Sequence, residues 1–300
     1  MLQDATTLLL TSQNADGGWG AVAGNRSTTE STALALLALQ TRDQAALGPA
    51  IGKAKTWLIE RQNADGSWPL ADGLKGPSWS TAFAMLALSE STESTERVIR
   101  AGRWALEQEG SKIGLLAKLV LALQFQKRAV HLNEDLIGWS WTPDTFSWVE
   151  PTSYFIIALK KLKRQLPPKA FQERVPQGEL MIYDRMCETG GWNYGNSSVY
   201  GDGLWPYPDV TAVALIALQD HSERKENQMS LQALGEMAKN TGSGLALGWT
   251  MLCYVLYGKD GAALKSLLER RFGKTKFLGE TKAIALSILA MGNGAKYFRI

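Results

Sequence analysis

Two kinds of helical pattern alternate along the chain. Residues 50–62 carry apolar side chains at Ile51, Ala54, Trp57 and Leu58 with lysines between them, a spacing that predicts an amphipathic helix. Residues 80–89 are apolar on almost every side, which predicts a buried helix. Similar apolar segments are expected at residues 29–41, 78–90, 112–127, 149–163, 208–220, 243–257 and 277–291. Amphipathic segments are expected at residues 3–13, 48–63, 93–108, 169–187, 226–240 and 260–272. The chain has no clean alternation of β-branched residues, so the sequence does not predict strands.

The sequence also repeats itself. Gln13-Asn14-Ala15-Asp16-Gly17-Gly18-Trp19 recurs as Gln62-Asn63-Ala64-Asp65-Gly66-Ser67-Trp68, and a weaker copy ends at Trp192. Such self-similarity is typical of stacked units that cannot bury their apolar faces alone. A closed double ring shields wholly apolar helices better than an open array, whose ends need polar caps. We therefore predict an all-α fold, an α/α toroid of about six helical hairpins, formed by residues 1–300 as a single domain.

Composition narrows the function classes. Apolar residues make up 45% and charged residues 20% of 300 residues, as in soluble globular proteins. The formal charge of +3 predicts no nucleic-acid partner. No apolar run is long enough to cross a bilayer and the first residues lack a secretory signal, so we expect a cytoplasmic protein. Two cysteines and two histidines are few for metal ligation, so we expect no metal and no cofactor. The chain also has a surplus of tryptophans, 11 in all, which its composition class does not explain.

Three apolar segments begin with an acid two residues before a threonine. These pairs are Glu30 with Thr32, Glu150 with Thr152, and Asp209 with Thr211. An acid in the first turn of a helix is favoured by the helix dipole. Two interpretations stay open: the acids cap their helices, or they point into the ring.

Two loops rich in aromatic residues lead into apolar helices. Residues 138–150 contain Trp139, Trp141 and Trp148, and residues 191–209 contain Trp205 and Tyr207. We expect both loops to overhang the same end of the ring. Their aromatic faces are candidates for binding a cation or an apolar chain, and they suit sugar stacking or simple packing equally well.

The repeat resembles a known family motif. Lys53-Ala54-Lys55-Thr56-Trp57-Leu58, followed by Gln62, Gly66 and Trp68, is similar to the QW repeat of the terpenoid cyclase and protein prenyltransferase superfamily. Leu8-Leu9-Gln13-Gly17-Trp19 matches it as well, and Met181-Ile182-Gly190-Trp192 matches in part. The resemblance implies the α/α toroid. It also implies that five residues brace the barrel, namely Gln13, Trp19, Gln62, Trp68 and Trp192.

The active-site motifs of that superfamily are incomplete here. Neither Cys187 nor Cys253 has the neighbouring Asp of the prenyltransferase zinc site, and the class I Asp-Asp-x-x-Asp motif is absent. In class II cyclases the middle Asp of Asp-x-Asp-Asp protonates an alkene. Alignment through Thr211 places Asp209 at that middle position with Tyr207 and Val210 in place of the flanking acids. Glu150 and Glu30 stand in the same frame.

The resemblance therefore implies a terpenoid-cyclase-like protein that binds an apolar isoprenoid or polyene in a central cavity. It implies a divergent proton-initiated (class II) cyclase, with Asp209 and Glu150 as candidate acids. The remaining candidates are substrate-binding residues: Glu30, Trp148, Trp205, Tyr207, Trp139 and Trp141. Whether the protein is an enzyme stays open.

Other interpretations remain. The incomplete motif is also consistent with a non-catalytic toroid scaffold that binds a protein or peptide, and helical double rings also occur in carbohydrate-processing enzymes. The basic stretches Lys160–Arg164 and Lys265–Lys276 are typical of solvated helix ends, with an anionic membrane surface as the alternative partner.

Overall fold

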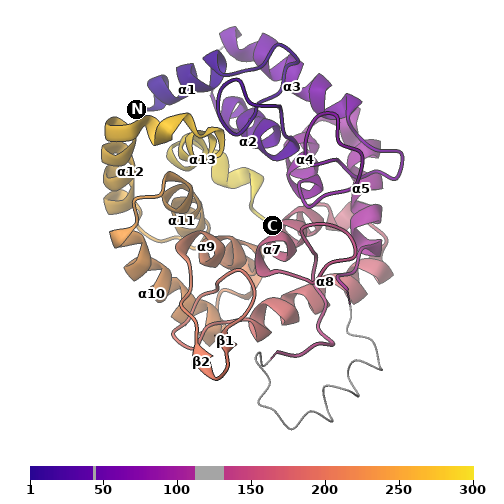
Figure 1. Ribbon diagram of the computed structural model, residues 1–300, viewed down its shortest axis with the longest axis vertical. Helices are drawn as coiled ribbons and strands as arrows, with labels where there is room; N and C mark the ends of the chain where they lie inside the picture. The colour runs from indigo at the N-terminus through magenta and orange to yellow at the C-terminus, as the bar shows by residue number, and fades with distance from the viewer. Residues whose placement is uncertain (43–44, 112–131) are drawn as a thin grey trace.

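Helices form two concentric rings around one axis (Figure 1). The structure, a computed structural model, describes residues 1–42, 45–111 and 132–300. Within these ranges the inner ring consists of α2 (Thr29–Gln40), α4 (Thr81–Leu88), α7 (Val149–Lys161), α9 (Pro208–Ala217), α11 (Gly244–Leu256) and α13 (Thr281–Met291). The outer ring consists of α1 (Leu2–Thr11), α3 (Gly48–Glu60), α5 (Thr95–Glu107), α8 (Pro168–Asp184), α10 (Lys225–Asn240) and α12 (Ala262–Thr275).

The inner ring is closed. Each inner helix contacts the next one along the chain, and α13 returns to contact α2. Five outer helices contact the inner helix that precedes them, and α1 completes the outer ring against α13. The prediction of an all-α toroid is confirmed. The predicted apolar segment at 112–127 lies outside the described residues, which contain six inner helices.

The two rings differ in burial as the sequence predicts. Every residue of α4 is buried, and so is every residue of α2 from Ser31 to Leu39. The outer helix α5 buries only one face, formed by Val98, Ala101, Gly102, Ala105 and Leu106. An apolar inner helix is stable in water only because an outer helix covers the side that faces away from the axis.

Short elements join the helices. The 3₁₀ turns are η1 (Ala45–Leu47), η2 (Thr92–Ser94), η3 (Lys163–Gln165), η4 (Gln219–His221), η5 (Lys276–Gly279) and η6 (Gly294–Tyr297). The strands β1 (Ser198–Val199) and β2 (Asp202–Gly203) form a small antiparallel hairpin.

The segment before α13 is less regular than the sequence pattern suggests. Residues 277–280 precede the helix, and Lys276, Phe277 and Leu278 have φ angles of 48°, 50° and 54°. Left-handed backbone costs about 1–2 kcal/mol for each residue other than glycine. The buried Phe277 ring, 5.6 Å from the Phe272 ring between centroids, offsets part of this cost.

The tryptophan of each repeat joins an outer helix to an inner helix. The Trp68 indole Nε1 donates to the Leu58 carbonyl of α3 at 2.7 Å. Its backbone N–H donates at 2.9 Å to the hydroxyl of Thr81, the first residue of α4. Gln62 donates to the carbonyls of Gly66 and Arg97, both at 2.9 Å. The same pair of tryptophan contacts recurs at Trp19, Trp139 and Trp192.

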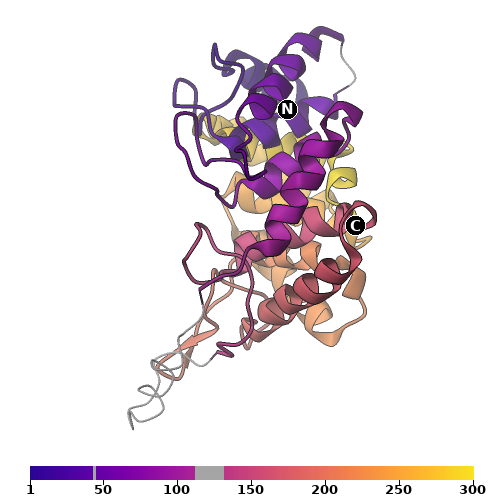
Figure 2. The ribbon, with the colours of Figure 1, turned by 90° about the vertical axis from the view of Figure 1, so that its right-hand side faces the viewer.

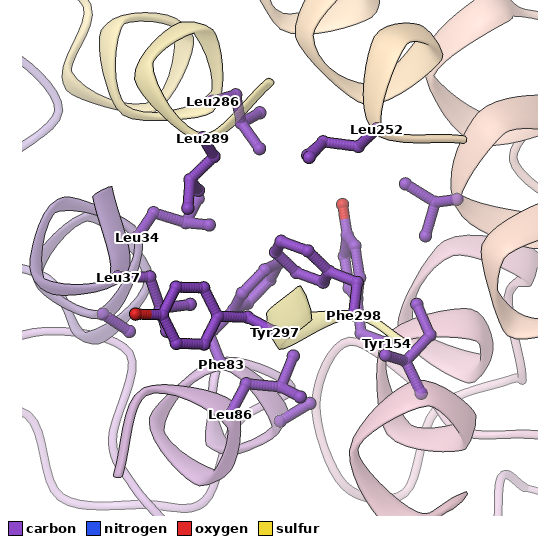
Figure 3. Packing of buried hydrophobic residues seen from close by; sticks show 14 of the residues in the cluster. Leu34, Leu37, Phe83, Leu86, Tyr154, Leu252, Leu286, Leu289, Tyr297 and Phe298 are labelled. Atoms are coloured by element: carbon purple, nitrogen blue, oxygen red, sulfur yellow. The ribbon is translucent and has the colours of Figure 1, made fainter. Parts of the chain in front are cut away.

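Side chains fill the axis of the barrel. Figure 3 shows residues from five inner helices meeting there, together with Tyr297 and Phe298 near the C-terminus. These labelled side chains are at most 3% exposed, namely Leu34, Leu37, Phe83, Leu86, Tyr154, Leu252, Leu286, Leu289, Tyr297 and Phe298. The central cavity that the sequence resemblance implies is therefore closed at this level of the barrel.

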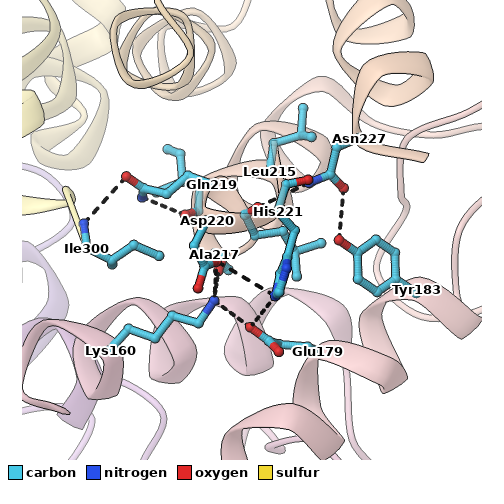
Figure 4. A network of polar contacts seen from close by, with 12 residues as sticks. Lys160, Glu179, Tyr183, Leu215, Ala217, Gln219, Asp220, His221, Asn227 and Ile300 are labelled. Atoms are coloured by element: carbon cyan, nitrogen blue, oxygen red, sulfur yellow. Dashed lines mark hydrogen bonds and ion pairs between the residues drawn. The ribbon is translucent and has the colours of Figure 1, made fainter. Parts of the chain in front are cut away.

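A polar network lies where α7 and α9 end (Figure 4). The Lys160 ammonium lies 2.5 Å from carboxylate oxygens of Glu179 and Asp220 and donates to the Ala217 carbonyl at 2.9 Å. Its side chain is only 7% exposed. The prediction that this basic residue belongs to a solvated helix end is wrong, because two acids from α8 and η4 compensate its charge. None of the helices in the described ranges has the length and hydropathy of a membrane span.

The contribution of a repeat tryptophan to the free energy of unfolding can be measured. Replacement of Trp68 by Phe leaves the buried Leu58 carbonyl without its indole donor, which costs about 1–3 kcal/mol. Urea unfolding of Trp68→Phe is expected to show this loss. The exposed Trp205 provides the control, because Trp205→Phe is expected to change stability by at most about 0.5 kcal/mol. Equal stability of Trp68→Phe and the unmodified protein would contradict the bracing role.

Candidate functional site

Five inner helices begin at the same end of the barrel. The loops that precede them are joined around the ring by backbone hydrogen bonds. The N–H groups donate to carbonyl oxygens in the pairs Thr29 to Leu70, Trp79 to Trp141, Val149 to Tyr194, and Thr281 to Ala21. In Figure 2 these loops lie on one face of the ring, and the C-terminus lies toward the other. The end formed by Glu30, Glu150, Asp209 and Lys282 is called the acid end below.

Glu30 pairs with a lysine on α13, the neighbouring inner helix. Thr28 caps α2, since its hydroxyl accepts from the Ser31 N–H at 3.2 Å, and Glu30 is left to bind Lys282 at 3.1 Å. Burial raises the pKa of Glu30, and Lys282 opposes that rise. Burial acts against the charge of Lys282, but Glu30 outweighs it and raises the pKa of the ammonium.

Glu150 has a pKa that is raised toward neutral pH. It lies in the first turn of α7 and accepts a hydrogen bond of 2.5 Å from the Tyr154 hydroxyl, one helical turn later. Burial raises the pKa of Glu150 to about 7, and the nearby charges of Asp209 and Glu30 add to the rise. The Tyr154 hydrogen bond and Lys282 act in the opposite direction. The carboxyl group is therefore mainly protonated below neutral pH.

Asp209 is the third acid. Pro208 begins α9 and Asp209 follows it, where backbone N–H groups of Asp209 and Val210 point at the carboxylate. Burial raises the pKa of Asp209, and these N–H groups and Lys282 limit the rise. The structure thus places all three predicted acids near one half-buried lysine, with Glu30 and Glu150 bonded to side chains of the ring.

Lys282, Tyr154 and Trp79 belong to this site and were not identified from sequence. Lys282 is the second residue of α13 and gave no motif signal. Trp79 stands two residues before Thr81, the same register in which Glu30, Glu150 and Asp209 precede their threonines. Thr81 is equivalent to the three threonines that follow the acids, because all four hydroxyls accept a hydrogen bond from the backbone N–H of a repeat tryptophan. Alignment of the repeats on these threonines would therefore have identified Trp79.

Aromatic rings form a floor beneath the acids. Trp79 stacks on Tyr154 with centroids 5.9 Å apart and an interplanar angle of 27°. Trp141 meets the Trp79 ring edge-on at 4.8 Å. Below them, Phe83 lies 4.5 Å from Tyr154 and 6.4 Å from Trp249. Tyr154 joins this floor to the acid end, because its hydroxyl donates to Glu150.

The predicted aromatic residues divide into two groups. Trp148, Tyr207 and Trp205 are exposed, by 37%, 49% and 76% of their surfaces. Trp139 is buried beneath the Arg174 guanidinium, whose carbon lies 3.6 Å from the ring centroid, and it makes the repeat-tryptophan contacts. The structure therefore places Trp139 in the wall of the barrel, away from the expected ligand surface, because its indole N–H is used by the Ala105 carbonyl.

A cavity of about 270 Å³ lies beside the acid end. Its lining is largely apolar and includes Trp148, and Gly195 packs against the Trp148 ring. The other lining residues are Ser111, Leu132, Glu134, Leu136, Ile137, Phe146, Ser147, Arg185 and Asn196.

One group of side chains has the composition of a metal site. The ligand atoms of Glu179, Asp220 and His221 lie within 4.8 Å of one another, at the opposite end of α9 from the acid end. The Lys160 ammonium already lies 2.5 Å from both carboxylates, so a cation occupies the space that a metal ion needs. Cys187 and Cys253 are buried free thiols, and burial raises the pKa of both.

Comparison with known proteins agrees with this architecture. The family model of the squalene-hopene cyclase N-terminal domain matches residues 2–128. The type II terpene cyclase MstE from Scytonema has a similar fold, with a TM-score of 0.60 at 16% identity over 99% of this chain and 97% of that one. At this low identity the solved structure shows that the chain shares the fold of such a cyclase. The sequence matches no curated protein.

Other solved structures share the fold with this chain. A variant of MstE in complex with its substrate geranylgeranyl dihydroxybenzoate has a TM-score of 0.58 at 14% identity, covering 99% of this chain and 96% of that one. An α-amylase from Clostridium perfringens has a TM-score of 0.62 at 10% identity, covering 97% of each chain. An inactive α-1,6-mannanase variant of Salegentibacter, bound to α-1,6-mannotriose, has a TM-score of 0.57 at 11% identity, covering 99% of this chain and 98% of that one.

The protonation of Glu150 predicts how the stability of the barrel depends on pH. The pKa of Glu150 is about 7 in the fold against 4.5 as the ordinary value, so the folded protein binds more protons than the unfolded chain between these pH values. Stability must therefore fall as pH rises through this window, by on the order of 3 kcal/mol from this group. The raised pKa values of Asp209 and Glu30 act in the same direction.

Urea unfolding at pH 5 and pH 8 measures this effect. Glu150→Gln is expected to lose much less stability than the unmodified protein over this range, because the amide cannot ionise. The exposed Glu223 is the control site, and Glu223→Gln is expected to keep the full pH dependence. An unchanged pH dependence in Glu150→Gln would show that Glu150 is ionised throughout.

Proposed function

We propose that the protein is a divergent proton-initiated cyclase that binds an apolar isoprenoid or polyene at the acid end, with Glu150 as the proton donor. One observation carries the proposal: a half-buried carboxyl group with a pKa raised to about 7 accepts a hydrogen bond from Tyr154, a tyrosine of the aromatic floor. A general acid must hold its proton in the resting state and reach the substrate without competing water.

The neighbours of Glu150 support proton donation. The Tyr154 hydroxyl already donates to the Glu150 carboxyl, and this bond strengthens as negative charge develops when the proton leaves. Lys282 forms an ion pair with Glu30, and its positive charge offsets part of the negative charge of the site. Asp209 lies close enough to raise the pKa of Glu150, so it favours the protonated resting form.

The acid end also matches a cationic intermediate. Protonation of an alkene leaves a carbocation, which aromatic faces attract and carboxylates stabilise. Trp79 and Tyr154 offer stacked rings below the acids, and Trp148 and Tyr207 are exposed beside them. This combination supports Trp148, Tyr207, Trp205 and Trp141 as substrate-binding residues and leaves Trp139 to the wall.

The similar fold of MstE bears on the substrate class. MstE takes geranylgeranyl dihydroxybenzoate, an isoprenoid chain joined to an aromatic acid, as its substrate. In this protein the axis is filled, so the chain must contact the rim of the barrel first. The cavity beside Trp148, about 270 Å³, lies just below the usual range of about 300–1,000 Å³ for ligand pockets and holds only part of such a chain.

A carbohydrate substrate is the second candidate. The exposed rings of Trp148, Tyr207 and Trp205 lie in loops that lead to Glu150 and Asp209, and paired carboxyl groups with aromatic platforms also suit glycoside hydrolysis. The α-amylase and the α-1,6-mannanase show that the fold can carry such activity. A non-catalytic scaffold that binds a protein through the same exposed rings is the alternative without chemistry.

Incubation with geranylgeranyl dihydroxybenzoate and with squalene tests the proposal, with products followed by mass spectrometry. Glu150→Gln is expected to lower turnover by about 10²–10⁴-fold, the usual contribution of a general acid. The rate is expected to fall as pH rises above 7, because Glu150 then loses its proton.

The controls separate the candidates. Glu223→Gln, on the outer surface, is expected to keep full turnover. Turnover that survives in both Glu150→Gln and Asp209→Asn would remove these acids from the mechanism. Release of sugars from α-glucan or α-mannan, with no isoprenoid product, would favour the carbohydrate function.

A further inference from the structure

The residues near the C-terminus enter the barrel from the end opposite the acids. The tail segment, Gly294–Ile300, begins with η6 and contacts the inner helices α2, α11 and α13. Figure 1 shows it crossing the inside of the ring, and Figure 3 shows Tyr297 and Phe298 among side chains of the inner helices. Phe298 is fully buried although it lies outside any helix.

Phe298 supports the aromatic floor from below. Its ring meets Trp249 edge-on with centroids 5.2 Å apart. Trp249 in turn lies 6.1 Å from Tyr154, which donates its hydrogen bond to Glu150. One series of ring contacts therefore connects the tail segment to the proposed proton donor.

Few polar contacts fix the tail segment in this position. The Gln219 amide donates to the Phe298 carbonyl at 2.9 Å and accepts from the Ile300 N–H at 3.4 Å (Figure 4). The Lys161 ammonium donates to the Lys296 carbonyl at 3.2 Å. By contrast, the surrounding wall consists of continuous helices with internal backbone bonds. The tail segment is thus the part of the axis that can leave without unfolding the rings.

We propose that the tail segment is a displaceable plug, and that the space filled by Phe298 is a binding site for the end of an apolar hydrocarbon chain. The inference rests on the proposed function for the class of ligand, an isoprenoid. It adds that the ligand competes with a segment of the protein itself for the part of the axis that lies beneath the aromatic floor.

The wall around the plug selects for hydrocarbon. Leu252, Leu286 and Leu289 point into this space beside Trp249. A space lined by such side chains stays dry and binds apolar molecules, whereas a sugar would lose its hydrogen bonds to water there. The plug keeps this surface covered by protein when no chain is bound.

Binding of tritiated geranylgeraniol to the full-length protein tests the plug. Phe298→Ala empties the space, and Gln219→Ala releases the tail segment while leaving every ring in place. Both variants are expected to bind geranylgeraniol at least about tenfold more tightly than the unmodified protein. Phe272→Ala is the matched control, because it removes an equally buried ring in α12, away from the axis, and is expected to leave binding unchanged.

The outcomes are distinct from those of the catalytic test. Unchanged affinity in both Phe298→Ala and Gln219→Ala, each shown to be folded by circular dichroism, overturns the plug even if the unmodified protein turns over isoprenoids. An equal gain in Phe272→Ala also overturns it, since the effect is then general loosening. Tighter binding in the two tail variants without turnover in any variant supports the plug and counts against proton-initiated cyclisation.

Discussion

The structure depends on shielding inner helices that are apolar on almost every side, six of them within the described ranges. Such helices cannot face water, and an outer ring covers them only if the inner ring has no free edge. The contact of α13 with α2 removes that edge. The repeat tryptophans then join the outer ring to the inner ring. In Trp68 the indole N–H donates to a carbonyl of the outer helix, and the backbone N–H donates to a threonine hydroxyl of the inner helix.

The same constraint creates the acid end. Since the loops before five inner helices bond to one another, the first turns of α2, α7, α9 and α13 converge at one end of the barrel. Residues that are far apart in sequence, Glu30, Glu150, Asp209 and Lys282, thereby share one partly desolvated space. Burial among like charges explains why Glu150 keeps its proton near neutral pH, and Lys282 explains why Glu30 can be ionised beside it.

Contacts between buried aromatic rings link the two ends of the barrel. Tyr154 touches the acid above it and lies in the ring cluster below, and Trp249 connects that cluster to Phe298. Because the axis is packed with rings, a ligand gains space only where a ring moves. The tail segment is held by side-chain hydrogen bonds from Gln219 and Lys161, whereas Phe83 and Tyr154 are fixed on helices.

The class of fold, the alternation of the two rings and the register of the three acids could all be predicted from the amino-acid sequence. They follow from local patterns: helical periodicity, a repeated Gln and Trp, and an acid two residues before a threonine. The sequence did not reveal that Lys282 and Tyr154 complete the acid end, that Trp139 belongs to the wall or that Phe298 fills the axis. Charge pairing and burial depend on closure of the ring, which brings together side chains whose separation along the chain carries no periodic signal.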